Sequence, residues 1–274
     1  MFDFILNNVV TKTPLVHSIT NYVTVNDCAN IILASGGSPI MADDIAEVCE
    51  ITSICSSLVI NIGTLNERTI DSMIAAGKRA NELGHPVVLD PVGAGASTLR
   101  NETALTLLKE VKFSVIRGNI SEIKFLATGS SNTQGVDAAA ADAVTADNID
   151  SVITFAKALS NTTGSVIAIT GVTDIVADKE KAYVIYNGNR LMSRVTGTGC
   201  MLSAVIGSYI GANPDHILEA TAAAVTAMGL SGELAYQKLI DVDGGTNSYR
   251  MYIIDRMSKM SVDQLKDGGR VEIR

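Results

Sequence analysis

Short apolar runs alternate along this chain with longer stretches of helical spacing, and this alternation constrains the fold more than any other feature. The runs are rich in Val and Ile, end in polar residues, and cover positions 58–61, 87–90, 114–117 and 166–170. Continuous apolar runs of this length are typical of parallel strands buried on both faces. Between the runs, apolar residues recur at helical intervals over positions 67–83, 98–111 and 148–159.

This order of elements predicts an α/β fold in three layers, with a central, mostly parallel sheet and helices on both faces. Ligands of such folds bind beyond the carboxyl ends of the strands, so polar residues at strand ends are the first candidates for a site. Two apolar runs at 175–177 and 183–186, separated by a charged turn, predict an antiparallel hairpin. After it, 200–210 and an Ala-rich stretch at 215–239 predict a pair of long helices.

No Pro- or Ser-rich linker interrupts this pattern, so we expect a single domain over residues 1–274, with a mobile loop at 129–143. The chain is 47% hydrophobic and only 18% charged, and it must therefore bury a large core.

Its formal net charge of -8 argues against nucleic acid or an anionic membrane as the main partner. The sequence has no apolar run long enough for a membrane span and no basic signal-peptide region near its start, which favours a cytoplasmic location.

The four cysteines, at 28, 49, 55 and 200, form no CxxC pair and are expected to be reduced thiols and not zinc ligands. The first three lie in apolar helical patterns and are expected in the core. Cys200 is different, because it follows the most distinctive motif of the chain.

That motif is Val-Thr-Gly-Thr-Gly-Cys at 195–200, which follows a strand-like segment and precedes an uncharged helix. Its glycines permit a tight turn, and the free N–H groups at the start of the helix attract phosphate oxygens. The motif predicts an anion hole formed by Gly197, Thr198, Gly199 and Cys200. An ordinary glycine-rich turn is the alternative. The chain has neither a GxxxxGK[ST] loop nor a complete GxGxxG loop, which argues against a P-loop or Rossmann site.

Cys200 falls in the first turn of this helix, where the helix dipole is expected to lower the thiol pKa. A thiolate there is a candidate general base for a substrate hydroxyl during phosphoryl transfer. The alternative is a small buried residue at a helix start.

Three predicted strand ends carry further candidates. Asp90 precedes a turn and is a candidate oxygen ligand for hydrated magnesium, although an Asx turn would also explain it. Asn119 and Glu122 have capping-box spacing, but capping leaves Arg117 unexplained. Arg117 suits phosphate oxygens and Glu122 suits metal-bound water. Thr170, at another strand end, is a weaker candidate for a phosphate contact.

The segments 16–21 and 36–42 contain no acidic side chain and no basic one other than His17, and they suit a neutral, partly apolar substrate. His17 itself is expected to be a hydrogen-bonded structural histidine, with a catalytic role as the alternative.

Taken together, these motifs are similar to those of a known family. The chain resembles the hydroxyethylthiazole kinases, which have a ribokinase-like fold, over nearly its whole length. The resemblance rests on ordered blocks at 14–21, 37–42, 61–65, 89–95, 116–122 and 196–200.

The resemblance implies magnesium-dependent transfer of the ATP γ-phosphoryl group to 4-methyl-5-(2-hydroxyethyl)thiazole in thiamine biosynthesis, by a homotrimer with sites between subunits. It implies Cys200 as the catalytic base and Asp90 and Glu122 as magnesium residues. It also implies that ATP is bound by Arg117, Thr170 and Asn119. The implied substrate-binding residues are Met41, Gly197 and Asn21.

At two positions this chain differs from many of the proteins it resembles. Most ribokinase-like relatives have Asp where this chain has Cys200, and some thiazole kinases have Asn where this chain has Tyr22. Three other functions stay open: a hydroxymethylpyrimidine kinase, whose glycine motif is expected to end in Asp, a thiol hydrolase using Cys200 and His17, and a non-catalytic nucleotide-binding protein.

Overall fold

The computed structural model describes residues 2–129, 144–145 and 147–274. Its strands are β1 (Leu15–Ile19), β2 (Ser38–Ile40), β3 (Ser57–Asn61), β4 (Val87–Asp90), β5 (Val115–Asn119), β6 (Val166–Thr170), β7 (Asp174–Ala177), β8 (Ala182–Ile185) and β9 (Val271–Ile273). In the described part of the chain they form one sheet of nine strands in the order β2-β1-β3-β4-β5-β6-β7-β8-β9. Strands β1 to β6 are parallel, and β7 to β9 are antiparallel.

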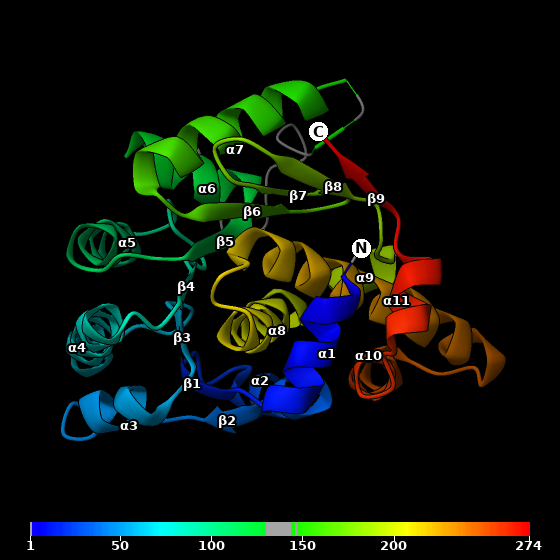
Figure 1. The fold of residues 1–274 in the computed structure, drawn as a ribbon, viewed down its shortest axis with the longest axis horizontal. Helices are drawn as coiled ribbons and strands as arrows, with labels where there is room; N and C mark the ends of the chain where they lie inside the picture. The colour runs from blue at the N-terminus through cyan, green and yellow to red at the C-terminus, as the bar shows by residue number, and fades with distance from the viewer. Residues whose placement is uncertain (1, 130–143, 146) are drawn as a thin grey trace.

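The helices before the hairpin are α1 (Asp3–Lys12), α2 (Val25–Ala34), α3 (Val48–Ile54), α4 (Glu67–Leu83), α5 (Thr98–Glu110), α6 (Ile120–Thr128) and α7 (Ile149–Thr163). After it come the 3-10 helix η2 (Arg190–Arg194) and then α8 (Thr198–Ala212), α9 (Ile217–Asp241), α10 (Thr246–Met257) and α11 (Val262–Gly268). Helices α3, α4 and α5 lie on one side of the sheet, and α1, α2, α8, α9 and α10 lie on the other (Figure 1). The predicted three-layer α/β fold with a mostly parallel sheet is therefore confirmed.

Each face of the sheet has its own apolar core. Because side chains alternate along a strand, one set of strand residues packs under α8 and the other under α4 and α5. The α8 side receives mostly Val from the central strands, namely Val16, Val59, Val88 and Val115. The opposite side receives larger residues, namely Leu58, Ile60, Leu89 and Ile116. The smaller side chains let α8 approach the sheet closely.

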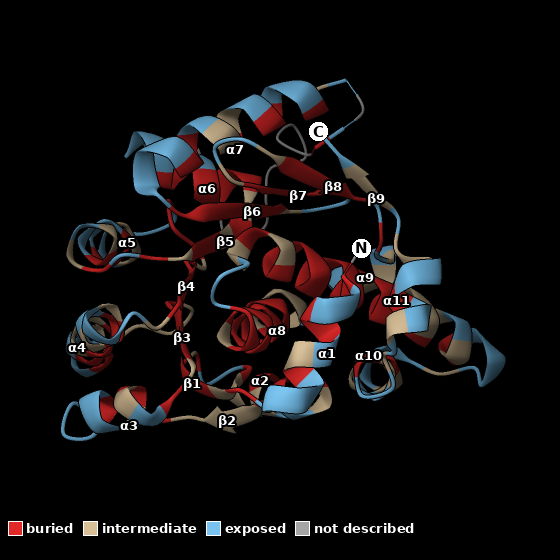
Figure 2. Cartoon of the chain, viewed as in Figure 1, coloured by how far each residue is buried: buried red, intermediate tan, exposed pale blue. Residues whose placement is uncertain are grey.

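Helix α8 is the most enclosed helix next to the sheet, as Figure 2 shows by its buried surface. All residues from Met201 to Ile210 are buried, which explains why the segment carries no charged residue. At Gly207 an added Cβ would lie 2.5 Å from Val59 Cγ2 and 3.1 Å from Val16 Cγ1. Glycine is required here by the close approach of α8 to β1 and β3.

Most predicted elements are found within a residue or two of their expected bounds, including the hairpin β7–β8 and the helical pair α8–α9. One expectation about the glycine motif is wrong, because the segment before it is η2 and not a strand. The side chain of Asn189 accepts a hydrogen bond from the Leu191 N–H and so starts this helical turn. The loop expected at 129–143 lies outside the described residues from position 130 on.

The expectation for Cys49 is also wrong. Cys28 and Cys55 are buried, but Cys49 is exposed. Helix α3 buries only Val48 and Thr52, which lie one turn apart on one face, and Cys49 falls on the outer face. Among the described residues, no helix combines the length and apolarity needed to cross a membrane.

We expect Gly207→Ala to destabilise the fold by about 1–3 kcal/mol, because the new methyl group overlaps Val59. Urea unfolding measures this cost. The control is Val59→Ala combined with Gly207→Ala, which removes the overlapping methyl groups. The double variant should lose less stability than the sum of the two single losses; simple additivity would contradict the proposed contact.

Candidate active site

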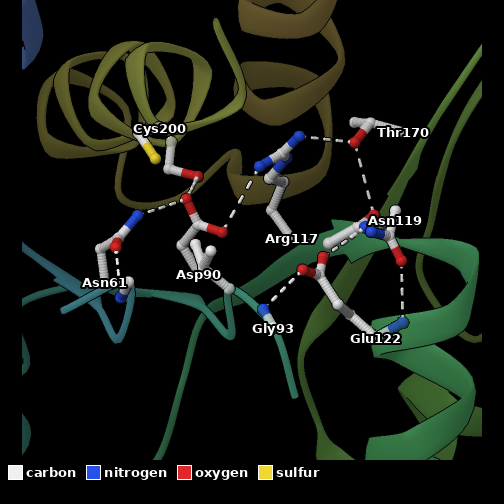
Figure 3. Close-up of polar contacts among 12 residues, drawn as sticks. Asn61, Asp90, Gly93, Arg117, Asn119, Glu122, Thr170 and Cys200 are labelled. Atoms are coloured by element: carbon white, nitrogen blue, oxygen red, sulfur yellow. Dashed lines mark hydrogen bonds and ion pairs between the residues drawn. The ribbon is translucent and has the colours of Figure 1, made fainter. Parts of the chain in front are cut away.

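The candidate site lies where the carboxyl ends of β3, β4, β5 and β6 meet the start of α8 (Figure 3). Parallel strands bring their carboxyl ends to one edge of the sheet, so residues distant in sequence become neighbours. Asn61 is the register partner of Asp90, and Asn119 is the partner of Thr170. The residues predicted from strand ends are thus brought together.

Asp90 ends β4 and is completely buried. Its Oδ2 accepts hydrogen bonds from Asn61 Nδ2 and Ser203 Oγ, both at 2.8 Å, and its Oδ1 lies 3.4 Å from Arg117 Nη1. Burial raises the pKa of the Asp90 carboxyl, while the Arg117 charge and the hydrogen bonds from Ser203 and Asn61 act in the opposite direction. Asp90 therefore connects β3, β5 and α8.

Arg117 lies in β5 and contacts two other candidate residues, Asp90 and Thr170. Its Nη2 donates to Thr170 Oγ1 at 2.7 Å, and its Nε is buried and has no hydrogen-bond partner among the residues that the structure describes. An added Cβ on Gly199 would lie 2.6 and 2.7 Å from the two terminal guanidinium nitrogens. The guanidinium group therefore packs directly against the first turn of α8, where only glycine leaves room for it. An unpartnered buried donor at this point suits an anionic ligand.

Asn119 and Glu122 form the capping box of α6. Asn119 Oδ1 accepts from the Glu122 N–H at 2.9 Å, and Glu122 Oε2 accepts from the Asn119 N–H at 2.8 Å. Glu122 Oε1 also accepts from the Gly93 N–H at 2.8 Å, which holds the turn after β4. Capping is thus one role of both residues, and Glu122 still faces the Asp90 side of the site.

Burial, followed by the negative charge of Asp90, raises the pKa of the Glu122 carboxyl to about 7. The two carboxylates therefore repel each other across the site. The hydrogen bonds from Gly93 and Asn119 and the Arg117 charge offset this repulsion only in part.

The start of α8 has the geometry expected of the glycine motif. Gly197 is the N-cap residue, with a left-handed φ of 86°. An added Cβ on Gly197 would lie 2.4 Å from Thr24 Cγ2, so conformation and space both require glycine. The first N–H groups of a helix have no partner within it, and Gly199 in this turn lies against the Arg117 guanidinium group. The anion hole itself stays a prediction.

Cys200 lies in this first turn and is partly buried. Its Sγ accepts a hydrogen bond from Asn21 Nδ2 at 3.3 Å. The expectation of a lowered thiol pKa is wrong: burial, followed by the Asp90 charge, raises the pKa of Cys200. Hydrogen bonding from Thr24 and the charge of Arg117 oppose this shift without reversing it. Desolvation of the thiolate is the largest cause of this shift.

The donor set fits a hydrated magnesium ion that arrives with a nucleotide. Among the described residues, no group of three or more His, Cys, Asp or Glu side chains is arranged to hold a metal alone. Asp90 and Glu122 already accept hydrogen bonds on both of their carboxylate oxygens. Mg²⁺ usually keeps several waters and is held by one or two carboxylates together with substrate phosphates. A divalent cation would also neutralise the repulsion between these two carboxylates.

His17 is confirmed as a structural histidine. It is completely buried in β1, with Nδ1 2.9 Å from Thr52 Oγ1 and Nε2 2.8 Å from the Ala42 carbonyl oxygen. A carbonyl oxygen only accepts, so Nε2 carries the proton and Nδ1 accepts from Thr52. Both ring nitrogens are engaged away from Cys200, which argues against a hydrolase that pairs these two residues.

Sequence reasoning missed two contributors to the site, Asn61 and Ser203. Both are neutral, and neither lies in a pattern that names a function by itself. A usable signal existed for Asn61, because it ends a strand predicted to lie beside the strand of Asp90. Ser203 follows Cys200 by three positions and therefore lies on the same face of α8. Met41 follows β2 and is partly buried against the core on the α8 side.

Comparison with known proteins agrees with this architecture. The family model described as "Hydroxyethylthiazole kinase family" matches residues 6–263. A protein from Clostridium acetobutylicum, named hydroxyethylthiazole kinase, is 64% identical over 267 residues, which cover 97% of each chain. A solved hydroxyethylthiazole kinase structure from Pyrococcus horikoshii has a TM-score of 0.88 at 32% identity and covers 99% of this chain and 98% of its own.

A ribokinase-like superfamily protein from Enterococcus faecalis has a TM-score of 0.62 at 12% identity, covering 93% of this chain and 89% of its own. This likeness concerns the fold, which is ribokinase-like as expected.

The buried His17 predicts a pH dependence of stability. Burial lowers its pKa below the ordinary value of 6.5. Above about pH 6.5 the ring is neutral in both the folded and the unfolded chain, so it has no effect on stability there. Below that pH the unfolded chain takes up a proton that the folded chain resists, and stability falls.

Urea unfolding at pH 7.5 and pH 5.5 measures this effect in the wild type and in His17→Gln. The wild type should lose more stability between the two pH values than the variant does. Equal losses would show that His17 does not titrate differently on folding.

Proposed function

This chain belongs to the hydroxyethylthiazole kinase family, and on that premise we propose that it transfers the γ-phosphoryl group of ATP to the hydroxyl group of 4-methyl-5-(2-hydroxyethyl)thiazole. The reaction would serve thiamine biosynthesis or salvage. The observation that carries the proposal is the position of Arg117. Its guanidinium group contacts Asp90 and Thr170 and packs against Gly199 at the start of α8. A group that joins these elements with an unpartnered N–H is suited to a triphosphate.

In the proposed mechanism, Arg117 and the N–H groups of residues 197–200 bind the oxygens of the transferred phosphoryl group. Thr170 and Asn119 lie at adjacent strand ends on the nucleotide side. Asp90 and Glu122 would hold hydrated magnesium, which supplies positive charge to the phosphates. The alcohol oxygen forms a bond to the γ-phosphorus, and the bond to the β-phosphate oxygen of ADP breaks.

Cys200 is proposed to accept the proton of the attacking hydroxyl group. Its raised pKa favours the thiol in the free enzyme, so Cys200 acts as a base only after its own proton has left to solvent. Transfer of the hydroxyl proton to this thiolate is expected late, once the hydroxyl has lost electron density to phosphorus. Such timing suits the loose transition state of phosphoryl transfer, which needs little help from a base.

Substrate binding is proposed for Met41 and Gly197, beside the neutral segments that include β1 and β2. Tyr22 and Val23 follow Asn21 directly and are 79% and 57% exposed. Large exposed apolar side chains at a site entrance suit coverage by another subunit. This supports a homotrimer with sites between subunits.

We also propose one domain over residues 1–274 and a cytoplasmic location. The nine strands of the described residues belong to one sheet, which supports the single domain. The free Cys200 thiol suits a reducing compartment. The net charge of -8 argues against nucleic acid or an anionic membrane as the main partner, and the proposed partners are the small-molecule substrates.

The activity is tested by coupling ADP release to a spectroscopic readout. The wild type should release ADP only when the thiazole alcohol, ATP and Mg²⁺ are all present. Cys200→Ala should lower kcat at least about tenfold, and Cys200→Asp, which restores a proton acceptor, should recover most of the loss. ADP release with hydroxymethylpyrimidine but not with the thiazole alcohol would support the pyrimidine kinase. Inactivation of an ATP-independent hydrolysis by iodoacetamide would support the thiol hydrolase.

The proposed magnesium role of Glu122 predicts a separate effect. Glu122→Gln keeps a capping residue at the start of α6 but removes the charge. The Mg²⁺ concentration for half-maximal activity should rise about tenfold or more. Some thermal stability should be lost as well, because the Gln NH₂ group cannot accept from one of the two N–H groups, of Gly93 and Asn119, that bond to Glu122. An unchanged Mg²⁺ requirement would argue against Glu122 as a magnesium residue.

A further inference from the structure

Two buried carboxamides connect the proposed base to the proposed magnesium residue. Asn61 ends β3 and Asn21 follows β1, and they are only 2% and 4% exposed. Asn61 Nδ2 donates to Asp90 Oδ2 at 2.8 Å. Asn21 Nδ2 donates to Asn61 Oδ1 at 3.0 Å and to Cys200 Sγ at 3.3 Å. The result is a continuous chain of hydrogen bonds from Asp90 to the Cys200 sulfur.

Backbone donors fix the orientation of both amides. The Gly63 N–H donates to Asn61 Oδ1 at 2.9 Å, and the Thr24 N–H donates to Asn21 Oδ1 at 3.1 Å. A backbone N–H only donates, so each amide must turn its oxygen toward it. The NH₂ group of Asn61 then has to face Asp90, and that of Asn21 has to face Cys200.

The backbone at Gly63 packs closely against both amides. An added Cβ on Gly63 would lie 2.9 Å from atoms of both Asn21 and Asn61. Thr24 Oγ1 also donates to Asn21 Oδ1, at 3.0 Å. The Asn21 carboxamide is therefore fully engaged: its oxygen accepts from Thr24 twice, and its two N–H bonds point at Asn61 and Cys200.

We infer that Asn21 and Asn61 are positioning residues for Cys200, holding its sulfur toward the substrate hydroxyl at a fixed place relative to Asp90. The inference rests on the proposed function, and it gives Asn21 a different role from the substrate contact implied by the family resemblance. An N–H donor at the sulfur stabilises the thiolate form, which is the form that can accept the hydroxyl proton.

This role predicts a loss in kcat and not in binding. Asn21→Asp has nearly the same shape and keeps the oxygen for Thr24, but it replaces the N–H donors with an acceptor. Asn21→Ser keeps a short oxygen near the Thr24 N–H but does not reach Cys200. Both variants should lower kcat about tenfold or more, with KM for ATP and for the thiazole alcohol changed less than about twofold.

The matched control is Asn26→Asp, which makes the same charge change at an exposed position of α2 and keeps the oxygen that accepts from Asn30. This control variant should leave kcat and the KM values for ATP and the thiazole alcohol unchanged. Wild-type activity is measured first, because failure there would refute the proposed function and not the positioning role.

A second measurement separates positioning from general damage. Iodoacetamide alkylation of Cys200 and of the exposed Cys49 is followed in the same sample by peptide mass spectrometry. In Asn21→Asp the rate at Cys200 should fall several-fold relative to the rate at Cys49, and Asn26→Asp should leave the ratio as in the wild type.

Two results would overturn the inference. If Asn21→Asp and Asn21→Ser raise KM for the thiazole alcohol and leave kcat intact, Asn21 is a substrate contact. If kcat falls while the alkylation ratio stays at the wild-type value, the asparagines support the fold and do not position the sulfur.

Discussion

The structure of the candidate site depends on one buried carboxylate, Asp90. A completely buried carboxylate costs free energy unless it is hydrogen-bonded or paired with a charge. Asn61, Arg117 and Ser203 meet this requirement from three different elements, β3, β5 and α8. The carboxylate thereby ties the edge of the sheet to the first turns of α8. The pKa of Asp90 and that of Cys200 are both raised, since burial dominates over the neighbouring donors.

The structure of the site also depends on the close approach of α8 to the sheet. Gly207 allows the helix to touch β1 and β3, and Gly199 leaves room for the Arg117 guanidinium. One helix therefore serves two purposes. Its uncharged body fills the core over the Val side chains of the sheet, and its first turn lies against Arg117, where helix N–H groups without intrahelical partners are suited to an anion. The same enclosure explains why the thiol of Cys200 is poorly solvated.

Much of this could be predicted from the sequence, because the signals were local. Continuous apolar runs located β3, β4 and β6, and the charged turn located the hairpin. The gathering of Asp90, Arg117 and Glu122 followed from the topology of parallel strands. The capping box of Asn119 and Glu122 was visible in their spacing. Burial was not visible, so the pKa of Cys200 was predicted in the wrong direction. Cys49 was misplaced because only Val48 and Thr52 of its helix face inward.

We propose that the ends of four parallel strands and the first turn of α8 bind one triphosphate. A crystal structure with a non-hydrolysable ATP analogue, Mg²⁺ and the thiazole alcohol tests it directly. The γ-phosphate should lie between Arg117 and the N–H groups of residues 198–200, with the alcohol oxygen next to the Cys200 sulfur. A nucleotide bound elsewhere, with Arg117 in contact only with Asp90 and Thr170, would contradict the claim.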